Sequence, residues 1–223
     1  MKAIAARAFA SVTQGCCRFS IFLWQILWGL ATVAAFVSVG GCGGNRGGAS
    51  STLSINPSAA AEKAIELYDK DRSGSLNESE LAACPGFLAA RDRYDKDGDR
   101  QISRDEIEER LKSIVATGTS FLMVDCRVLQ GGRPLAGANV RFVPDPSMED
   151  ALLQASGTTD AQGQVNPSVA DEQLPEERKG VHIMQPGVYR VEVEHPSVKK
   201  PHTPLGCEID ELTRGGTDVM FRL

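Results

Sequence analysis

The chain has 223 residues, of which 42% are hydrophobic and 24% charged, with a formal net charge of −5. This length and composition are typical of one or two globular domains. The acidic balance argues against a nucleic-acid partner, because phosphate binding needs clustered Lys and Arg, and no basic stripe with interleaved aromatics occurs in the sequence.

Residues 1–41 are predicted to be a targeting segment. They contain Lys2, Arg7 and Arg18 and no acidic residue, and the stretch from Phe19 to Val39 is uncharged and long enough to span a bilayer. The stretch ends in VGGC at Cys42, which resembles the lipobox of bacterial lipoproteins, where the cysteine receives the lipid. An uncleaved transmembrane anchor and a plain secretory signal are the alternatives. All three place the body of the protein outside the cytoplasm.

Residues 42–58 are then expected to be the lipidated N-terminus, with Cys42 acylated, followed by a flexible linker rich in glycine and serine. Membrane lipid, attached through Cys42, is therefore an expected partner. The expected location is extracytoplasmic, with the protein anchored to a bacterial membrane.

A pair of calcium loops is predicted over residues 59–117. Apolar residues spaced three and four apart from Ala61 to Tyr68 predict a short helix, and the next twelve residues, DKDRSGSLNESE (69–80), match the EF-hand loop throughout. Ca²⁺ prefers six to eight oxygen ligands, Gly74 suits the sharp turn, and Leu76 is the apolar residue that joins paired loops. The expected ligands are the side chains of Asp69, Asp71 and Ser73, the Ser75 carbonyl, Asn77 directly or through water, and both carboxylate oxygens of Glu80.

The second loop, DKDGDRQISRDE (95–106), has one carboxylate more than the first and Ile102 as the counterpart of Leu76. Arg100 stands where the motif asks for glycine, which should cost about 1–2 kcal/mol and hence about five- to thirtyfold in affinity. Gly98 could relax part of this turn. A weakened site that still binds at extracellular calcium concentrations is predicted. Its expected ligands are Asp95, Asp97, Asp99, the Gln101 carbonyl, Ser103 and Glu106.

The connector between the loops is short and contains Pro85. The helix after the first loop should therefore end near Cys84, and a second helix should run from Pro85 to Tyr94. The last helix should bury Ile107, Leu111 and Ile114 and end at Gly118. A compact pair without methionine favours structural calcium over calcium sensing. A calcium-regulated interaction module, of the kind found in dockerins, is the alternative.

Beyond Gly118 the hydrophobic period changes to two, which predicts an antiparallel β-sandwich over residues 119–223. The predicted fold class is therefore α+β, with a small helical EF-hand pair followed by the sandwich. The strand-like runs are Leu122–Val128, Val140–Phe142, Tyr189–Val193, Leu205–Ile209 and Val219–Leu223.

Three segments of this region resemble a known family. They are GGRPLAGANVRFVP (131–144), SGTTDAQGQV (156–165) and QPGVYRVEVEHP (185–196), which look like the carboxypeptidase regulatory-like, transthyretin-type domain. The order of lipobox, loop pair and sandwich is similar to that of lipoproteins of planctomycete-type bacteria. The resemblance implies a seven-stranded sandwich and an envelope location, with an envelope protein or polysaccharide as a possible partner, and it implies no reaction.

No catalytic motif is evident. His182, His195 and His202 lie in or beside loop-like stretches without metal-ligand spacing, and residues 171–180 mix charges as a solvated loop does. A non-catalytic sandwich is thus predicted. An envelope enzyme is the remaining alternative, and it would need a pair of carboxylates that meet in a cleft.

Cys126 and Cys207 both fall in the inward phase of their strands. In an oxidising compartment they could form a disulfide, and as buried residues they could equally remain free thiols. Both alternatives stay open on the sequence.

Overall fold

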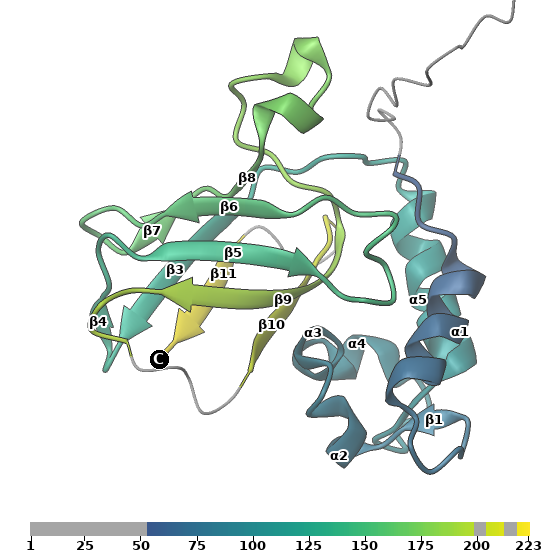
Figure 1. Cartoon of the computed structure of the whole chain (residues 1–223). Helices are drawn as coiled ribbons and strands as arrows, with labels where there is room; N and C mark the ends of the chain where they lie inside the picture. Colours follow the sequence, from purple (N-terminus) through teal and green to yellow (C-terminus); the bar gives the residue numbers. More distant parts are fainter. Residues whose placement is uncertain (1–52, 199–203, 212–217) are drawn as a thin grey trace, which may run out of the picture. The chain divides into compact units, whose positions relative to one another are not determined.

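The computed structural model describes residues 53–198, 204–211 and 218–223, which form an α+β fold (Figure 1). They belong to one compact unit. The predicted targeting segment, Cys42 and His202 lie outside the described residues. Within the part that is described, no helix is both long and apolar enough to cross a membrane.

The N-terminal half is helical. Helix α1 begins at Pro57, ahead of the periodic run that starts at Ala61, because the Asn56 side chain accepts a hydrogen bond from the Ala59 amide and proline suits the first helical position. Two short strands lie inside the two loops. The elements are α1 Pro57–Tyr68, β1 Ser75–Leu76, α2 Glu78–Leu81, α3 Pro85–Ala89, α4 Arg91–Tyr94, β2 Ile102–Ser103 and α5 Arg104–Ala116.

The prediction of one helix from Pro85 to Tyr94 is wrong. At Ala90 the backbone leaves helical geometry, with φ −105° and ψ 8°, and this residue separates α3 from α4. Helix α3 packs on the second half of the chain, whereas α4 packs against α5 and leads into the second loop. Because of the break at Ala90, α3 packs on strand β10 (Leu205–Ile209) while α4 packs against α5.

The C-terminal half consists of two β-sheets (Figure 1). One has the strand order β10-β9-β5-β6-β8, and the other the order β11-β3-β4 with β7 also paired to β3. The strands are β3 Asp125–Gln130, β4 Arg133–Pro134, β5 Asn139–Pro144, β6 Ala155–Thr158, β7 Gln164–Val165, β8 Ser168–Val169, β9 Gly187–Glu194, β10 Leu205–Ile209 and β11 Asp218–Arg222.

The expectation of a purely antiparallel sandwich needs correction at one pair of strands. Strand β11 runs parallel to β3, with Val219 opposite Cys126 and Phe221 opposite Val128. Strand β10 belongs to the five-stranded sheet, and the next strand, β11, belongs to the other sheet. There it lies beside β3 and runs in the same direction. The resemblance implied seven strands, and nine strand segments occur in the described part of this half.

Alternation along the strands builds the core between the sheets, as predicted. Cys126, Val128, Phe142 and Tyr189 are buried. The Phe142 ring lies edge-on to Tyr189, with centroids 6.2 Å apart, and meets Phe221 of the other sheet at 6.1 Å. The loop over residues 171–180 contains two 3₁₀ turns, η1 Asp171–Gln173 and η2 Glu176–Arg178, and is mostly exposed, as expected.

The helical half is packed directly on strand β10. A Cβ atom on Gly206 would lie 2.3 Å from the Gly86 amide nitrogen, and a Cβ on Gly86 would lie 2.4 Å from Val188 Cγ1. Only glycine allows the backbones of α3 and β10 to approach so closely. The buried side chains of both halves form one hydrophobic cluster, and α3 covers the edge strand β10.

The cysteines in the described residues are Cys84, Cys126 and Cys207, and all three are free and buried. Of the two alternatives for Cys126 and Cys207, the structure therefore has free thiols. Burial raises the pKa of Cys126 to about 12. Burial, followed by the Asp145 charge, raises the pKa of Cys84 to about 12.

Candidate metal centre in two paired acidic loops

The first loop gathers three of its predicted ligands. Asp69, Asp71 and Glu80 each offer one carboxylate oxygen, and these three oxygens lie within 4.8 Å of one another. Asp69 follows the end of α1, and its carboxylate accepts hydrogen bonds from the amides of Ser73 (3.1 Å) and Gly74 (2.8 Å). These bonds fold the loop inward, so the carboxylates converge although they are up to eleven positions apart in the chain.

The remaining predicted ligands of the first loop lie beside this group. The Ser73 hydroxyl is 3.0 Å from the Ser75 carbonyl oxygen, so these two oxygens are adjacent. The Asn77 amide group donates to Asp71 (3.2 Å), while its oxygen accepts from Ser79 and from the Glu80 amide to cap α2. Because that oxygen is already engaged, the arrangement favours the water-bridged role for Asn77.

The second loop gathers Asp95, Asp97 and Asp99, again with one carboxylate oxygen each within 4.8 Å of the others. The Glu106 carboxylate is not part of this group. One Glu106 oxygen accepts from the Lys96 amide (2.8 Å), and the other accepts from the amide (2.8 Å) and hydroxyl (2.7 Å) of Ser103. The Gln101 amide donates to Asp99 (2.7 Å).

The last glutamate of each loop is held in the same way. Glu80 accepts from the amides of Lys70 (2.8 Å) and Asn77 (3.0 Å), as Glu106 does from those of Lys96 and Ser103. In both loops this glutamate therefore closes the loop on its second residue and forms a capping box for the helix that follows.

Hydrogen bonding keeps carboxylates of both loops ionised. Bonding from Ser73 is the main reason that the pKa of Asp71 lies below its usual value. Burial acts to raise the pKa of Glu106, but hydrogen bonds from Ser103 and Lys96 outweigh it and lower that pKa. Three carboxylates this close repel one another, and a bound cation removes the repulsion. Each group could therefore hold a metal ion.

Both loops contain one arginine in the left-handed backbone region. Arg100 has φ +67°, and Arg72, which the sequence analysis did not single out, has φ +60°. The glycines occupy the complementary positions, Gly74 at φ +87° and Gly98 at φ +79°. Gly98 thus takes a left-handed turn of its own and does not relieve Arg100. Aligning the loops would have revealed Arg72, because it falls at the position of Gly98.

The two loops are joined side by side, as predicted. Strands β1 and β2 pair antiparallel, with Leu76 opposite Ile102 and Ser75 opposite Ser103. Leu76 and Ile102 are fully buried. Because each strand is part of a loop, the pairing of β1 with β2 connects the two loops directly.

The loop pair is also tied to the sandwich by polar residues that the sequence analysis missed. The Tyr68 hydroxyl, next to Asp69, donates to the buried Asp145 (3.0 Å). Glu208 and Asp210 are buried at β10 and form ion pairs with Arg110 of α5 at 3.0 and 2.6 Å. No local pattern marks these carboxylates, since their partners lie far away in the chain.

Two of the three histidines, His182 and His195, lie within the described residues. His195 Nδ1 lies 2.7 Å from the Ser197 hydroxyl in an exposed turn, and His182 is also exposed. Glu208 and Asp210 are a carboxylate pair, but arginine neutralises them. Burial acts to lower the pKa of Arg110, and these two carboxylates outweigh it and raise that pKa.

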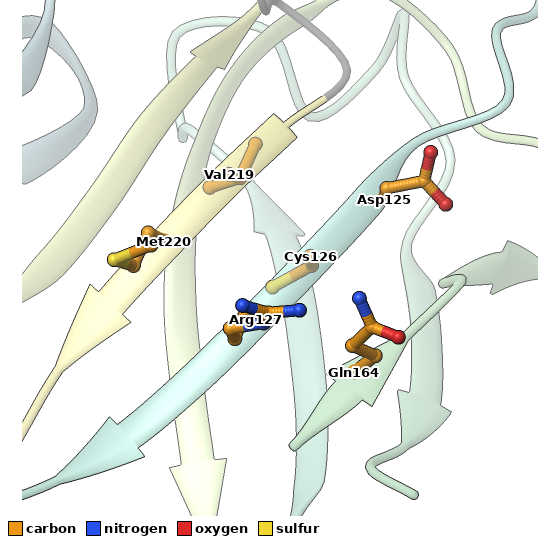
Figure 2. A pocket seen from close by; sticks show the side chains of 6 residues that line it. All are labelled: Asp125, Cys126, Arg127, Gln164, Val219 and Met220. Atoms are coloured by element: carbon orange, nitrogen blue, oxygen red, sulfur yellow. The ribbon is translucent and has the colours of Figure 1, made fainter. Parts of the chain in front are cut away.

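Two shallow grooves lie on the sandwich. One, of about 310 Å³, is lined by polar residues around His182 and Asp160. The other, of about 290 Å³, lies over β3, β7 and β11, where Figure 2 shows Arg127 and Gln164 on neighbouring strands and Met220 on β11. Each groove has a single carboxylate among its described lining residues, Asp160 and Asp125 respectively.

Comparisons with family models, with curated proteins and with solved structures found no match for this chain. The fold and the site therefore define the class: an α+β protein in which two paired acidic loops, each able to hold a metal ion, are packed on a sandwich-like pair of sheets.

Proposed function

We propose that this protein is a calcium-binding, membrane-anchored envelope lipoprotein, in which an EF-hand pair stabilises the attachment of a non-catalytic, transthyretin-like sandwich. The observation that carries the proposal is the convergence of three carboxylates in each of two loops that β1 and β2 join. The ligands are all oxygens, which suits Ca²⁺ and does not suit zinc, which prefers nitrogen and sulfur. Mg²⁺ is less suited, because it keeps several waters and uses few protein ligands.

The packing of the loop pair supports a structural role for calcium. Leu76, Ile102, Ile107 and Leu111 are fully buried, and α3 is fixed to β10 by the contact of Gly86 with Gly206. A sensor opens its helices on binding calcium and exposes an apolar groove, usually rich in methionine. Opening this pair would break its contact with the sandwich, and residues 59–117 contain no methionine.

The sandwich is proposed to be a binding or structural module for an envelope protein or polysaccharide. The single carboxylate among the described lining residues of each groove and the neutralised Glu208–Asp210 pair support a non-catalytic role. The anchor is proposed on the sequence alone, from the uncharged stretch that ends at Cys42. Mass spectrometry of the mature N-terminus tests it: we expect an acylated Cys42 at the first position, and an intact segment 1–41 would contradict the lipoprotein assignment.

Calorimetric titration with calcium of residues 43–223 tests the calcium proposal. We expect two binding events in the parent protein and one in each of the variants Glu80→Gln and Glu106→Gln, because each removes a charged ligand from one loop. A dye that reports exposed apolar surface should respond little to calcium. No binding heat and no calcium-dependent stabilisation would contradict the proposal, and a strong increase in dye fluorescence would favour calcium sensing instead.

A further inference from the structure

The second loop is bracketed by two arginines that bind the same carboxylate. Arg93 lies in α4, two residues before Asp95, and Arg110 lies in α5, four residues after Glu106. Arg93 Nη1 is 2.7 Å from Glu208 Oε2, and Arg110 contacts both oxygens of Glu208, through Nε at 3.1 Å and Nη2 at 3.0 Å. The helix that enters the loop and the helix that leaves it are therefore fixed to one side chain of β10.

The environment of Glu208 makes these contacts strong. Its side chain is 0% exposed and that of Arg110 is 12% exposed, whereas Arg93 is 35% exposed. Hydrogen bonds between charged groups are stronger than neutral ones, and a two-pronged arginine contact also fixes orientation. A second buried carboxylate, Asp210, accepts a hydrogen bond from Arg110 Nη2 at 2.6 Å.

We propose that Glu208 is a positioning residue for metal binding in the second loop, although it belongs to the sandwich and lies outside the loop. By holding α4 and α5 together, it presets the separation of the two ends of the loop, at Asp95 and Glu106. A preset loop loses less conformational freedom when the ion binds, which raises affinity. Linkage is reciprocal, so an ion in this loop strengthens the attachment of the helices to β10 by the same factor. The inference rests on the proposed calcium function.

Among the residues that the structure describes, the first loop has no comparable pair of arginines that bind one carboxylate of the sandwich. Its entering helix α1 is tied to the sandwich through Tyr68 and Asp145 and through Lys63, which lies 3.4 Å from both Glu149 and Asp150. Within the described residues, no ion pair links its leaving helix α2 to the sandwich. The effect of Glu208 should therefore be specific to the second loop.

Calcium titration of the full chain in detergent micelles tests this inference. The parent and all variants carry Glu80→Gln, which removes binding at the first loop, so that the titration measures calcium binding to the second loop alone. Adding Arg93→Ala should weaken binding about tenfold, as expected for the loss of its charge-assisted contact with Glu208, and adding Glu208→Gln should weaken it further. The control is Arg141→Ala, which removes an arginine of similar exposure (38%) that pairs with Glu192 in the sandwich and should leave the affinity unchanged.

Hydrogen exchange of residues 205–209 supplies a readout independent of affinity. Calcium should slow exchange of these β10 amides in the parent and in Arg141→Ala, and it should do so much less in Arg93→Ala. If Glu208→Gln does not fold, the Arg93→Ala variant tests the inference by itself. Arg93 is more exposed than Arg110, so its removal should disturb folding less. Parent-like affinity together with undiminished calcium protection of β10 in Arg93→Ala would overturn the inference and leave the calcium function intact. A chain with native loops that binds no calcium would overturn both.

Discussion

Arg72 and Arg100 adopt a backbone conformation that glycine adopts without strain and other residues rarely do, with φ of +60° and +67°. Each loop needs two left-handed residues, and each supplies one glycine and one arginine in opposite order. The backbone strain that was expected from the sequence in the second loop alone is therefore present in both loops. A difference in affinity between the loops must therefore have another source than this strain, such as Asp99 in the second loop where the first has Ser73.

Replacing either arginine by glycine should help its own loop. We expect Arg100→Gly and Arg72→Gly each to improve calcium affinity or stability by about 1 kcal/mol, the relief of left-handed strain less the added freedom of the unfolded chain. Calcium titration and thermal unfolding measure both. The double variant Arg72→Gly/Gly74→Arg, which gives the first loop the order of the second, is the control and should behave as the native loop does. A gain at Arg100 without a gain at Arg72 would contradict equal strain.

The lowered pKa of Glu106 predicts how acid affects the metal-free protein. A carboxyl whose pKa is lower in the folded state stabilises the fold above its unfolded pKa, and this contribution is lost as the pH falls through the folded pKa. In a chelator, the stability difference between native protein and Glu106→Gln should be constant near neutral pH and decrease from about pH 4.3, the ordinary pKa of glutamate, downward. Unfolding midpoints measured against pH test this, and a difference independent of pH would disprove it.

At the scale of elements, the sequence predicts those features that depend on residues close together in the chain. The loops, the Leu76–Ile102 pairing and the end of α5 near Gly118 follow from ligand spacing and hydrophobic period within a few residues. The inward alternation of β3, β5 and β9 follows in the same way. The parallel pairing of β11, the break at Ala90 and the burial of Glu208 depend on contacts between distant segments, so local patterns could not predict them.

The contact between α3 and β10 should be intolerant of any side chain. In Gly206→Ala the new methyl group would lie 2.3 Å from the Gly86 nitrogen and 2.4 Å from the Pro85 carbonyl carbon, and backbone cannot move aside as a flexible side chain can. We expect a loss of about 2–3 kcal/mol of stability, at the upper end for an overpacked core. Chemical denaturation measures it.

Gly180→Ala is the matched control for this prediction. Its methyl group meets no atom within 4 Å, but the residue has φ +75°. It should therefore lose only about 1 kcal/mol, from backbone strain. Equal losses in the two variants would show that the close approach of α3 to β10 does not contribute.

For the whole molecule, the shared core means that the helical half and the sandwich should unfold together. Buried residues of both halves form one cluster, and ion pairs and the glycine contact cross between them. Ligands that bind only the folded state raise its stability by mass action. On the proposed function, calcium should thus protect the sandwich although no proposed ligand belongs to it.

Differential scanning calorimetry tests this cooperativity. We expect one transition, which moves to higher temperature as calcium increases and to lower temperature in a chelator, by an amount that Glu80→Gln and Glu106→Gln each reduce. Two transitions, of which only one responds to calcium, would show that the halves are independent and would contradict the shared core.

The three buried thiols bear on the conditions under which the body can fold. Small domains outside the cytoplasm often depend on disulfides, whereas Cys84, Cys126 and Cys207 are free here. Burial raises the pKa of each of these thiols, which keeps them protonated and hence slow to react. The body should fold as well in a reducing medium as in an oxidising one, which suits production in the bacterial cytosol. On the proposed function, the calcium concentration of the surroundings, rather than their redox state, would then determine the stability of the folded protein.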